Sequence, residues 1–291
     1  MVKILITGSR GQVGQCLVNL LSRRSDIEVI AYDREQLDIT NEAKVRATIS
    51  ALKPDVIINA AAHTSVDLAE TDICASYGIN RDGPLFLAKA AQAYDSLMLH
   101  ISTDYVFDGD KSEPYVETDV PNPKGVYGQS KLAGEEAVMN HCTRYAILRT
   151  AWVFGEYGNN FVKTMLRLGN ERTELGIIGD QFGGPTYAGD IAKALVAVMD
   201  NFKSPELSGV YHYAGEPHVS WYQFSRFIFA AAELHGVIEQ TPNIYEITSA
   251  QYPLPAPRPA NSRLNCTKIQ DTFGIVPSDW QAALENIKSY C

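Results

Sequence analysis

The chain has 291 residues, of which 45% are hydrophobic and 20% charged, a composition typical of a globular protein with a sizeable core and not of a disordered or fibrous one. Its formal net charge of -9, with no cluster of Lys and Arg, excludes nucleic acid as an expected partner, because binding to phosphate backbones requires concentrated positive charge. The cysteines contain no C-x-x-C pair, which argues against a zinc site or a disulfide framework.

The first residues, MVKILITG, predict a buried strand from Lys3 to Thr7, which leaves no room for a leader peptide. No apolar run approaches the length of a membrane span, so no membrane partner is expected. Five cysteines without a paired pattern fit a reducing compartment. The sequence therefore predicts a cytoplasmic protein.

Short apolar runs alternate with segments of helical period through the first half of the chain, which is typical of βαβ units around a parallel sheet. The predicted strands are Lys3–Thr7, Glu28–Tyr32, Val56–Ala60, Leu97–Ser102 and Tyr145–Arg149. We expect an α/β fold in which a Rossmann-type doubly wound parallel sheet forms a dinucleotide-binding domain over residues 1–150.

Three glycines directly follow the first predicted strand. Gly8, Gly11 and Gly14 have G-x-x-G-x-x-G spacing, and an amphipathic helix begins among them. Glycine is needed where the chain turns sharply, where its backbone approaches a pyrophosphate and where the helix packs closely on the strand. The helix N-terminus adds free N–H groups and a partial positive charge. The pattern therefore predicts a dinucleotide-binding turn.

The ends of the next strands supply further candidate cofactor contacts. Asp33 follows the second strand, about twenty residues after the glycines, where a carboxylate can accept hydrogen bonds from the adenosine ribose. Arg34 is suited to a 2′-phosphate, so NADH and NADPH both stay open. Asp38 and Ile39 are placed to flank the adenine. The small residues of Asn59-Ala60-Ala61-Ala62 leave room for the cofactor at the third strand.

Tyr127 and Lys131 form a Y-x-x-x-K pair, which places a phenol and an ammonium on one helical face. The pair carries little weight alone, since a chain with 15 tyrosines contains on the order of one such pair by chance. It gains weight because it follows the strand HISTDYVF, whose end opens near the same crevice. We expect Lys131 to lower the pKa of Tyr127, Tyr127 to protonate a carbonyl oxygen, and Thr103 to hold both groups in register.

From about Trp152 the pattern becomes less regular. Aromatic and glycine-rich turns alternate with helices predicted near Phe161–Leu168 and Asp190–Asp200. The proline-dense stretch YPLPAPRPANSRL precedes the last helical segment and predicts a loop or connector. We expect residues 151–291 to form mainly a smaller C-terminal substrate-binding lobe, with some segments returning to the first domain.

These motifs together resemble the extended short-chain dehydrogenase/reductase superfamily and, more closely, its dTDP-4-dehydrorhamnose reductase family. The likeness spans nearly the whole chain. It depends on seven segments in order: TGSRGQVG, NAAAHTSVDLAE, STDYVFDG, YGQSKLAGE, RTAWVFGEYGNNFVKTML, DQFGGPT and RPANSRL. The last four are more specific than the motifs of the superfamily.

The resemblance implies hydride transfer from NADH or NADPH to C4 of dTDP-4-dehydro-6-deoxy-L-mannose, a nucleotide sugar. It gives Tyr127 the role of proton donor and places Lys131 at the nicotinamide ribose. Thr103 and Asp104 would contact the sugar, and Trp152 would line the substrate pocket. The residues implied to border the cofactor are Gly11, Gln12, Val13, Asp33, Asp38, Ile39, Ala62, His63 and Thr64.

Three further expectations concern residues with more than one interpretation. For His63, packing or a backbone contact is favoured over catalysis. Arg258 is suited to bind the nucleotide diphosphate in a bidentate manner, although an exposed loop arginine is usually solvated. Some members of the family are described as homodimers bridged by a metal between acidic side chains, and Cys16 and Gly189 stand where such carboxylates are expected. No metal site is therefore predicted.

Two other readings of the same motifs stay open. One is another enzyme of the same fold that acts on a nucleotide sugar: a different 4-ketoreductase, a 4-epimerase or a 4,6-dehydratase. The dehydratases carry Thr-Asp-Glu where this chain has Thr103-Asp104-Tyr105, so no base for C5 is evident. An epimerase would keep its NAD through catalysis. The other is a non-catalytic subunit, since the regulatory β subunit of methionine adenosyltransferase resembles the same reductases. Intact Thr103, Tyr127 and Lys131 favour an enzyme.

Overall fold

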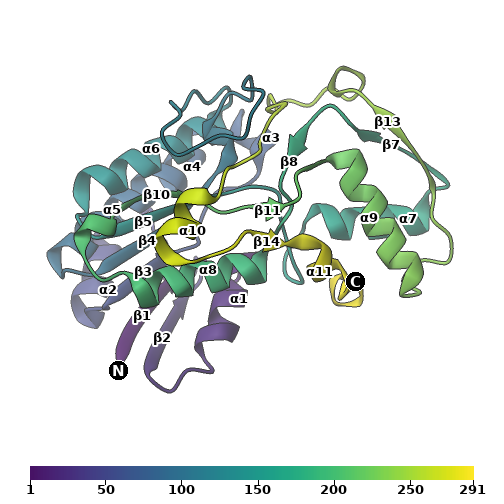
Figure 1. The fold of residues 1–291 in the computed structure, drawn as a ribbon. Coiled ribbons are helices and arrows are strands. Elements are labelled where there is room, and N and C mark those ends of the chain that lie inside the picture. Colours follow the sequence, from purple (N-terminus) through teal and green to yellow (C-terminus); the bar gives the residue numbers. More distant parts are fainter.

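The central sheet of the computed structural model, which describes residues 1–291, has six parallel strands with helices on both faces (Figure 1). The strand order is β10-β5-β4-β3-β1-β2, and every neighbouring pair is parallel. The strands are β1 (Val2–Thr7), β2 (Ile27–Tyr32), β3 (Val56–Asn59), β4 (Leu97–Thr103), β5 (Tyr145–Thr150) and β10 (Gly209–His212). The predicted doubly wound α/β fold is confirmed.

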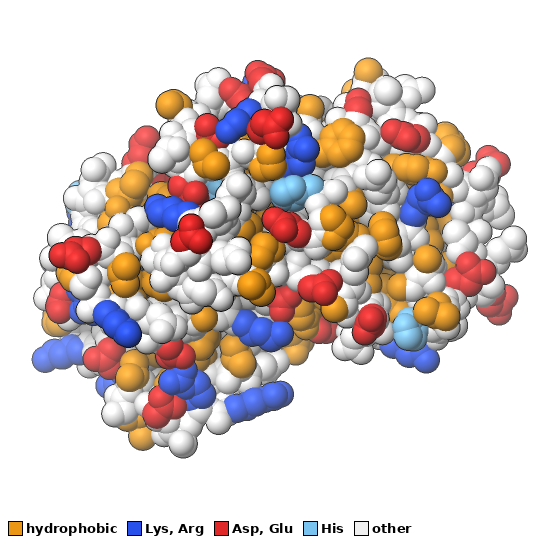
Figure 2. All heavy atoms as spheres, in the orientation of Figure 1, with side chains coloured by type: hydrophobic (Ala, Val, Ile, Leu, Met, Phe, Trp, Pro, Cys, Tyr) orange, Lys and Arg blue, Asp and Glu red, His pale blue; other side chains and the backbone are white.

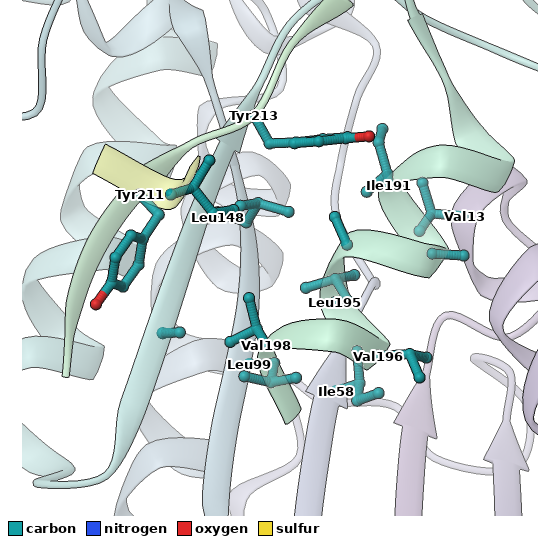
Figure 3. Close-up of a cluster of buried hydrophobic side chains, with 14 of the residues drawn as sticks. Val13, Ile58, Leu99, Leu148, Ile191, Leu195, Val196, Val198, Tyr211 and Tyr213 are labelled. Atoms are coloured by element: carbon teal, nitrogen blue, oxygen red, sulfur yellow. The ribbon is translucent and has the colours of Figure 1, made fainter. Parts of the chain in front are cut away.

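Alternation of side chains along each strand divides the core into two layers. Ile4 and Ile6 of β1 face a cluster with α1 (Gln12–Leu21), α8 (Ala188–Asn201) and α10 (Thr267–Phe273). Figure 3 shows part of this cluster, in which Leu195 and Val198 of α8 and Leu99 and Leu148 of the sheet belong to the same buried layer. The opposite layer contains Leu5 of β1 and the helices α2 (Glu42–Leu52), α5 (Gly83–Ala93) and α6 (Val126–His141).

The second lobe lies beyond the carboxyl ends of the sheet strands (Figure 1). Its separate core joins α7 (Phe161–Glu171), α9 (Trp221–Leu234) and α11 (Trp280–Leu284), with Phe224, Phe229 and Trp280 fully buried. Its short strands are β6 (Val153–Phe154), β7 (Glu174–Ile178), β8 (Phe182–Gly183), β9 (Thr186–Tyr187), β11 (Gly215–Glu216), β12 (Val219–Ser220), β13 (Asn243–Ile247) and β14 (Ser278–Asp279).

All five predicted strands are present, and most extend one residue further than predicted. The exception is the third strand, which ends at Asn59 and not at Ala60. The helices predicted near Phe161–Leu168 and Asp190–Asp200 are α7 and α8 and are longer than predicted. The sixth strand, β10, comes from the second half of the chain and pairs with β5.

Two short helices connect β3 to α5 and border the site. They are α3 (Val66–Ala69) and α4 (Ile73–Tyr77), and a π-helical turn, Gly78–Asp82, follows them. None of the helices has the length and apolar character that a bilayer crossing demands. On the face shown in Figure 2, Lys and Arg side chains are scattered among Asp and Glu.

The sheet order determines where a ligand site can form. Strand β1 lies between β2 and β3. The chain adds β2 on one side of β1 and then crosses to the other side to add β3, so the order of strands reverses at β1. Ligands of open parallel sheets bind outside the carboxyl ends of the strands at such a reversal. The glycine turn follows β1 and Asn59-Ala60-Ala61-Ala62 contains the end of β3, so both segments border this crevice.

Candidate active site

The turn after β1 depends on glycine at two positions. Gly8 has φ +73°, and a Cβ atom there would lie 2.5 Å from the Ala61 nitrogen. A Cβ atom at Gly14 would lie 2.2 Å from the Gly8 oxygen. Gly11 is the N-cap of α1 and offers no capping side chain, so the first amides of the helix remain free to bind an anion. This backbone fits a pyrophosphate.

A cavity of about 390 Å³ opens beside this turn. It brings together nine of the residues predicted to hold the cofactor: Gly8, Gly11, Asp33, Asp38, Ile39, Ala60, Ala62, His63 and Thr64. Gln12 instead accepts a hydrogen bond from Asn160 at 3.1 Å. Val13 and Gly14 are buried in α1. The cavity fits the adenosine half of a dinucleotide, with small residues on the β3 side.

The Asp33 carboxylate is held by its own turn and by an arginine that the sequence analysis did not select. Its Oδ1 accepts hydrogen bonds from the backbone N–H groups of Glu35 and Gln36, both at 3.0 Å. Its Oδ2 pairs with the Arg10 guanidinium at 2.8 Å, and Arg10 is 73% exposed. Positive charge beside Asp33 therefore comes from Arg10 as well as from Arg34, and both residues line the cavity.

His63 is fixed mainly through its backbone. Its N–H donates to Asn80 Oδ1 at 2.8 Å, and Asn80 Nδ2 donates to its carbonyl at 3.0 Å. The ring Nδ1 is 3.2 Å from the Ser76 hydroxyl. Asn80 is fully buried and also donates to Ser130 of α6, so it links the cofactor edge to the helix that carries Tyr127.

Helix α6 places Tyr127 and Lys131 on its buried face. Both side chains are under 10% exposed, and the Lys131 ammonium donates to the Ile101 carbonyl of β4 at 2.7 Å. Burial lowers the pKa of Lys131 to about 8, although the Glu135 carboxylate acts to raise it. Lys131 is therefore easier to deprotonate than a free lysine but remains mostly protonated at neutral pH.

The predicted lowering of the Tyr127 pKa by Lys131 is wrong for this structure. Burial raises the pKa of Tyr127 to about 12, since desolvation disfavours the phenolate. A hydrogen bond with Thr103 lowers it and the Asp104 charge raises it further, while the Lys131 ammonium is directed to the Ile101 carbonyl. Tyr127 is consequently a protonated phenol that can act as an acid.

Thr103 ends β4 and connects Tyr127 to Asp104. The Thr103 hydroxyl donates to Asp104 Oδ1 at 2.9 Å and accepts from the Tyr105 N–H at 3.3 Å. Asp104 is only 2% exposed, and burial raises its pKa to about 6, although the nearby Ser262 and Thr103 hydroxyls act to lower it. The contact of Asp104 with a sugar stays a prediction. With 2% of its surface exposed, Asp104 offers a ligand little area to contact.

Trp152 and Arg258 are the two remaining predicted substrate contacts. Trp152 has φ +47°, a rarely populated conformation for a bulky residue, and its ring stacks on Trp221 with centroids 3.4 Å apart. It packs against both the sheet core and the core of the second lobe. The Arg258 guanidinium pairs with Asp67 of α3 at 2.9 Å. To bind a diphosphate as predicted, Arg258 would have to release Asp67 or contact both groups at once.

Sequence reasoning missed four residues that complete the site. Arg10 neutralises Asp33, Asn80 holds the backbone of His63, and Tyr105 packs edge-to-face on Tyr127 with centroids 5.5 Å apart. Glu135 lies one helical turn after Lys131 and is fully buried. Only Glu135 had a usable signal, because its spacing in YGQSKLAGE continues the face of Tyr127 and Lys131.

A glycine turn at the head of a doubly wound sheet, with a buried Tyr-Lys pair at the same strand ends, defines a short-chain dehydrogenase/reductase, an oxidoreductase that uses a nicotinamide dinucleotide. The comparison with known proteins refines this class. The chain belongs to the RmlD substrate binding domain family, which matches residues 2–290.

Two curated relatives are both dTDP-4-dehydrorhamnose reductases. The one from Aggregatibacter actinomycetemcomitans is 52% identical over 100% of this chain and 99% of its own. The one from Sinorhizobium fredii is 39% identical over 98% of this chain and 96% of its own.

Solved structures agree with this assignment. The crystal structure of a dTDP-4-dehydrorhamnose reductase from Clostridium acetobutylicum has a TM-score of 0.92 and 39% identity, and it covers 99% of this chain and 98% of its own. The enzyme from Bacillus anthracis, in complex with NADP, has a TM-score of 0.90 and 36% identity over 99% of both chains. A UDP-glucose 4-epimerase from Thermotoga maritima, at 22% identity, shares the fold.

The Arg10–Asp33 pair predicts how the chain discriminates between NADPH and NADH. Without Arg10, the Asp33 carboxylate would repel a 2′-phosphate, so Arg10→Ala should lower kcat/KM for NADPH about three- to tenfold more than for NADH. Steady-state kinetics with each cofactor measures this ratio. Arg23→Ala, at an exposed arginine outside the cavity, is the control. An unchanged ratio in Arg10→Ala would contradict this role for Arg10.

The raised pKa of Asp104 predicts a pH-dependent stability difference. Because its folded pKa is about 6 and its reference pKa 3.8, Asp104 binds its proton more tightly in the folded state. Its contribution is therefore fully present below pH 3.8 and is lost as the pH rises through 6. The stability of the unmodified protein relative to Asp104→Asn should fall by on the order of 3 kcal/mol between pH 4 and pH 7.

Urea unfolding at several pH values measures this difference. Asp279→Asn, at an exposed helix cap of the second lobe, serves as the control. A pH-independent difference for Asp104→Asn would show that the buried carboxyl has an ordinary pKa.

Proposed function

We propose that this chain reduces the C4 keto group of dTDP-4-dehydro-6-deoxy-L-mannose to give dTDP-L-rhamnose, with NADPH or NADH as the reductant. The observation that carries the proposal is the convergence of Tyr127, Lys131 and Thr103 at the strand ends where the glycine turn lies. Curated relatives at up to 52% identity over the full chain support the substrate, and the NADP complex of a relative supports the cofactor.

The nicotinamide would supply the hydride, and the chain's own side chains supply the proton and the geometry. Tyr127 stays protonated at neutral pH, since its pKa is about 12, and it donates that proton to the carbonyl oxygen as negative charge develops there. Thr103 holds the phenol and the carbonyl in register. Lys131, in its protonated form, binds the nicotinamide ribose and stabilises the negative charge that the phenol acquires.

The second lobe would bind the nucleotide sugar. We assign residues 1–150 mainly to the cofactor and residues 151–291 mainly to the substrate, although β10 and α8 of the second half belong to the central sheet layers. Trp152 would line the sugar pocket, Asp104 would approach the sugar, and Arg258 would contact the diphosphate. We further propose that the chain works in the cytoplasm and that a homodimer, where formed, has no metal bridge, since Cys16 and Gly189 provide no carboxylate.

The proposal is tested by incubating the protein with dTDP-4-dehydrorhamnose and each reduced cofactor and identifying the sugar formed. We expect oxidation of the cofactor with formation of dTDP-L-rhamnose. NAD that copurifies and stays bound through turnover would support a 4-epimerase instead. Good cofactor binding without oxidation by any 4-keto nucleotide sugar would support a regulatory subunit.

Removing the phenol hydroxyl should separate binding from catalysis. Tyr127→Phe should bind NADPH with nearly normal affinity but lose at least about 100-fold in kcat, because general acid catalysis typically contributes that much. Fluorescence titration gives the affinity and NADPH oxidation gives the rate. Tyr245→Phe, at an exposed tyrosine of β13, is the control. Near-normal turnover in Tyr127→Phe would exclude this residue as the proton donor.

A further inference from the structure

The buried face of α6 carries a third charged residue after Tyr127 and Lys131. Glu135 follows Lys131 by four residues and is fully buried, and the preceding Gly134 is also buried. A buried carboxylate without partners would be strongly unfavourable, so its contacts show what it does.

Both oxygens of Glu135 are occupied by groups from the sheet. Oε1 accepts from the Ser102 hydroxyl of β4 at 2.5 Å and from Arg149 Nε of β5 at 2.9 Å. Oε2 accepts from Arg149 Nη2 at 2.6 Å. The guanidinium is 3% exposed and lies over the Phe107 ring, 5.0 Å from its centroid. Glu135 thus connects α6 to two adjacent strands through a bidentate ion pair.

These contacts lie in sequence along β4. Lys131 donates to the Ile101 carbonyl, and Glu135 accepts from the hydroxyl of the next residue, Ser102. Thr103 follows, and its hydroxyl is close enough to the Tyr127 phenol to lower the pKa of that phenol. Polar contacts with fixed directions therefore set the position of α6 along the strand. Apolar packing contributes less here, because the buried face of α6 beside the strand consists largely of polar side chains and glycines.

We propose that the buried Glu135–Arg149 pair is a positioning element for the reaction: it fixes α6 against β4 and β5 and keeps a negative charge one helical turn from the Lys131 ammonium. The inference rests on the proposed reductase function for its kinetic consequences. Glu135 acts through Lys131 and Tyr127 and contacts neither substrate nor cofactor.

The charges around Lys131 make Glu135 its main electrostatic partner. From α6 it faces Glu135 and the neutral Tyr127. From β4 it faces His100, whose pKa is lowered well below its usual value by burial and by the Lys131 charge, so this ring is neutral. From β5 comes Arg149, whose guanidinium is paired with Glu135. Glu135 therefore keeps the pKa of Lys131 higher than burial alone would allow.

The test uses two variants and one control. Glu135→Gln removes the charge but leaves Arg149 buried without its partner, which can prevent folding. The double variant Glu135→Leu/Arg149→Met replaces the whole pair by apolar side chains, a change that proteins often tolerate. Glu136→Gln removes a charge from the exposed neighbour and should change neither measurement.

The direct measurement is the titration of Lys131 by NMR in protein labelled with ¹³C at the lysine ε-carbons, with the signal assigned by its loss in Lys131→Met. The midpoint should fall from the value near 8 in the unmodified protein by about one pH unit in Glu135→Gln. It should fall by less in the double variant, because that variant also removes the positive charge of Arg149. The alkaline limb of kcat/KM for NADPH oxidation should move by the same amount, because the protonated lysine is the active form. In Glu136→Gln both should stay unchanged.

Unchanged midpoints in the folded variants would overturn the inference. A changed midpoint with an unchanged pH profile would also overturn it, since Glu135 would then not act on the reaction. Failure of the proposed function is a separate result: the unmodified protein would not oxidise NADPH with a 4-keto nucleotide sugar, while the NMR titration would still measure the effect of Glu135 on Lys131.

Discussion

The hydrogen bond from Lys131 to the Ile101 carbonyl joins the two parts of the molecule on which the site depends, the sheet edge and helix α6. The parallel sheet delivers the glycine turn, the Asn59-Ala60-Ala61-Ala62 segment and Thr103 to one edge, because the carboxyl ends of parallel strands point the same way. Helix α6 must then present its phenol and ammonium at that edge. A shift of one helical turn along β4 would separate Tyr127 from Thr103.

Burial decides the protonation states at this edge more than pairwise charge does. The phenol of Tyr127 becomes a weaker acid than free tyrosine, and Lys131 becomes easier to deprotonate than free lysine. A protonated phenol suits the reductive direction, in which the carbonyl oxygen receives a proton. Asp104 and Glu135 introduce negative charge close to this pair, and their effects differ because Glu135 is paired with Arg149 while Asp104 has only hydroxyl and backbone donors.

Much of the fold could be predicted because the signals are local. The apolar run of residues 3–7 and the glycines that follow it indicate strand, turn and helix without knowledge of the rest of the chain. Strand ends were less certain, because the ladder of hydrogen bonds and not composition decides whether Thr103 or Thr150 still belongs to a strand. Strand β10 was missed because GVYH is four residues long and lies far from the other strands in the sequence.

In the site, spacing predicted which residues of α6 share a face, but the strength of their interactions depends on contacts between distant segments. The pairing of Arg258 with Asp67 joins residues 191 positions apart, and burial of Tyr127 requires the whole packed assembly. No sequence pattern predicts the Arg258–Asp67 pair or the burial of Tyr127. The same limit explains why the expected lowering of the Tyr127 pKa was wrong: burial raises this pKa, and Lys131 is not among the groups that shift it.

The most direct measurement is a crystal structure of the protein with NADPH bound. The account predicts a pyrophosphate at the first amides of α1, an adenosine ribose beside Asp33 and Arg10, and a nicotinamide ribose within hydrogen-bonding distance of Lys131, with the ring next to Tyr127. A cofactor whose nicotinamide lies away from α6, or one bound outside the crevice between β1 and β3, would contradict it.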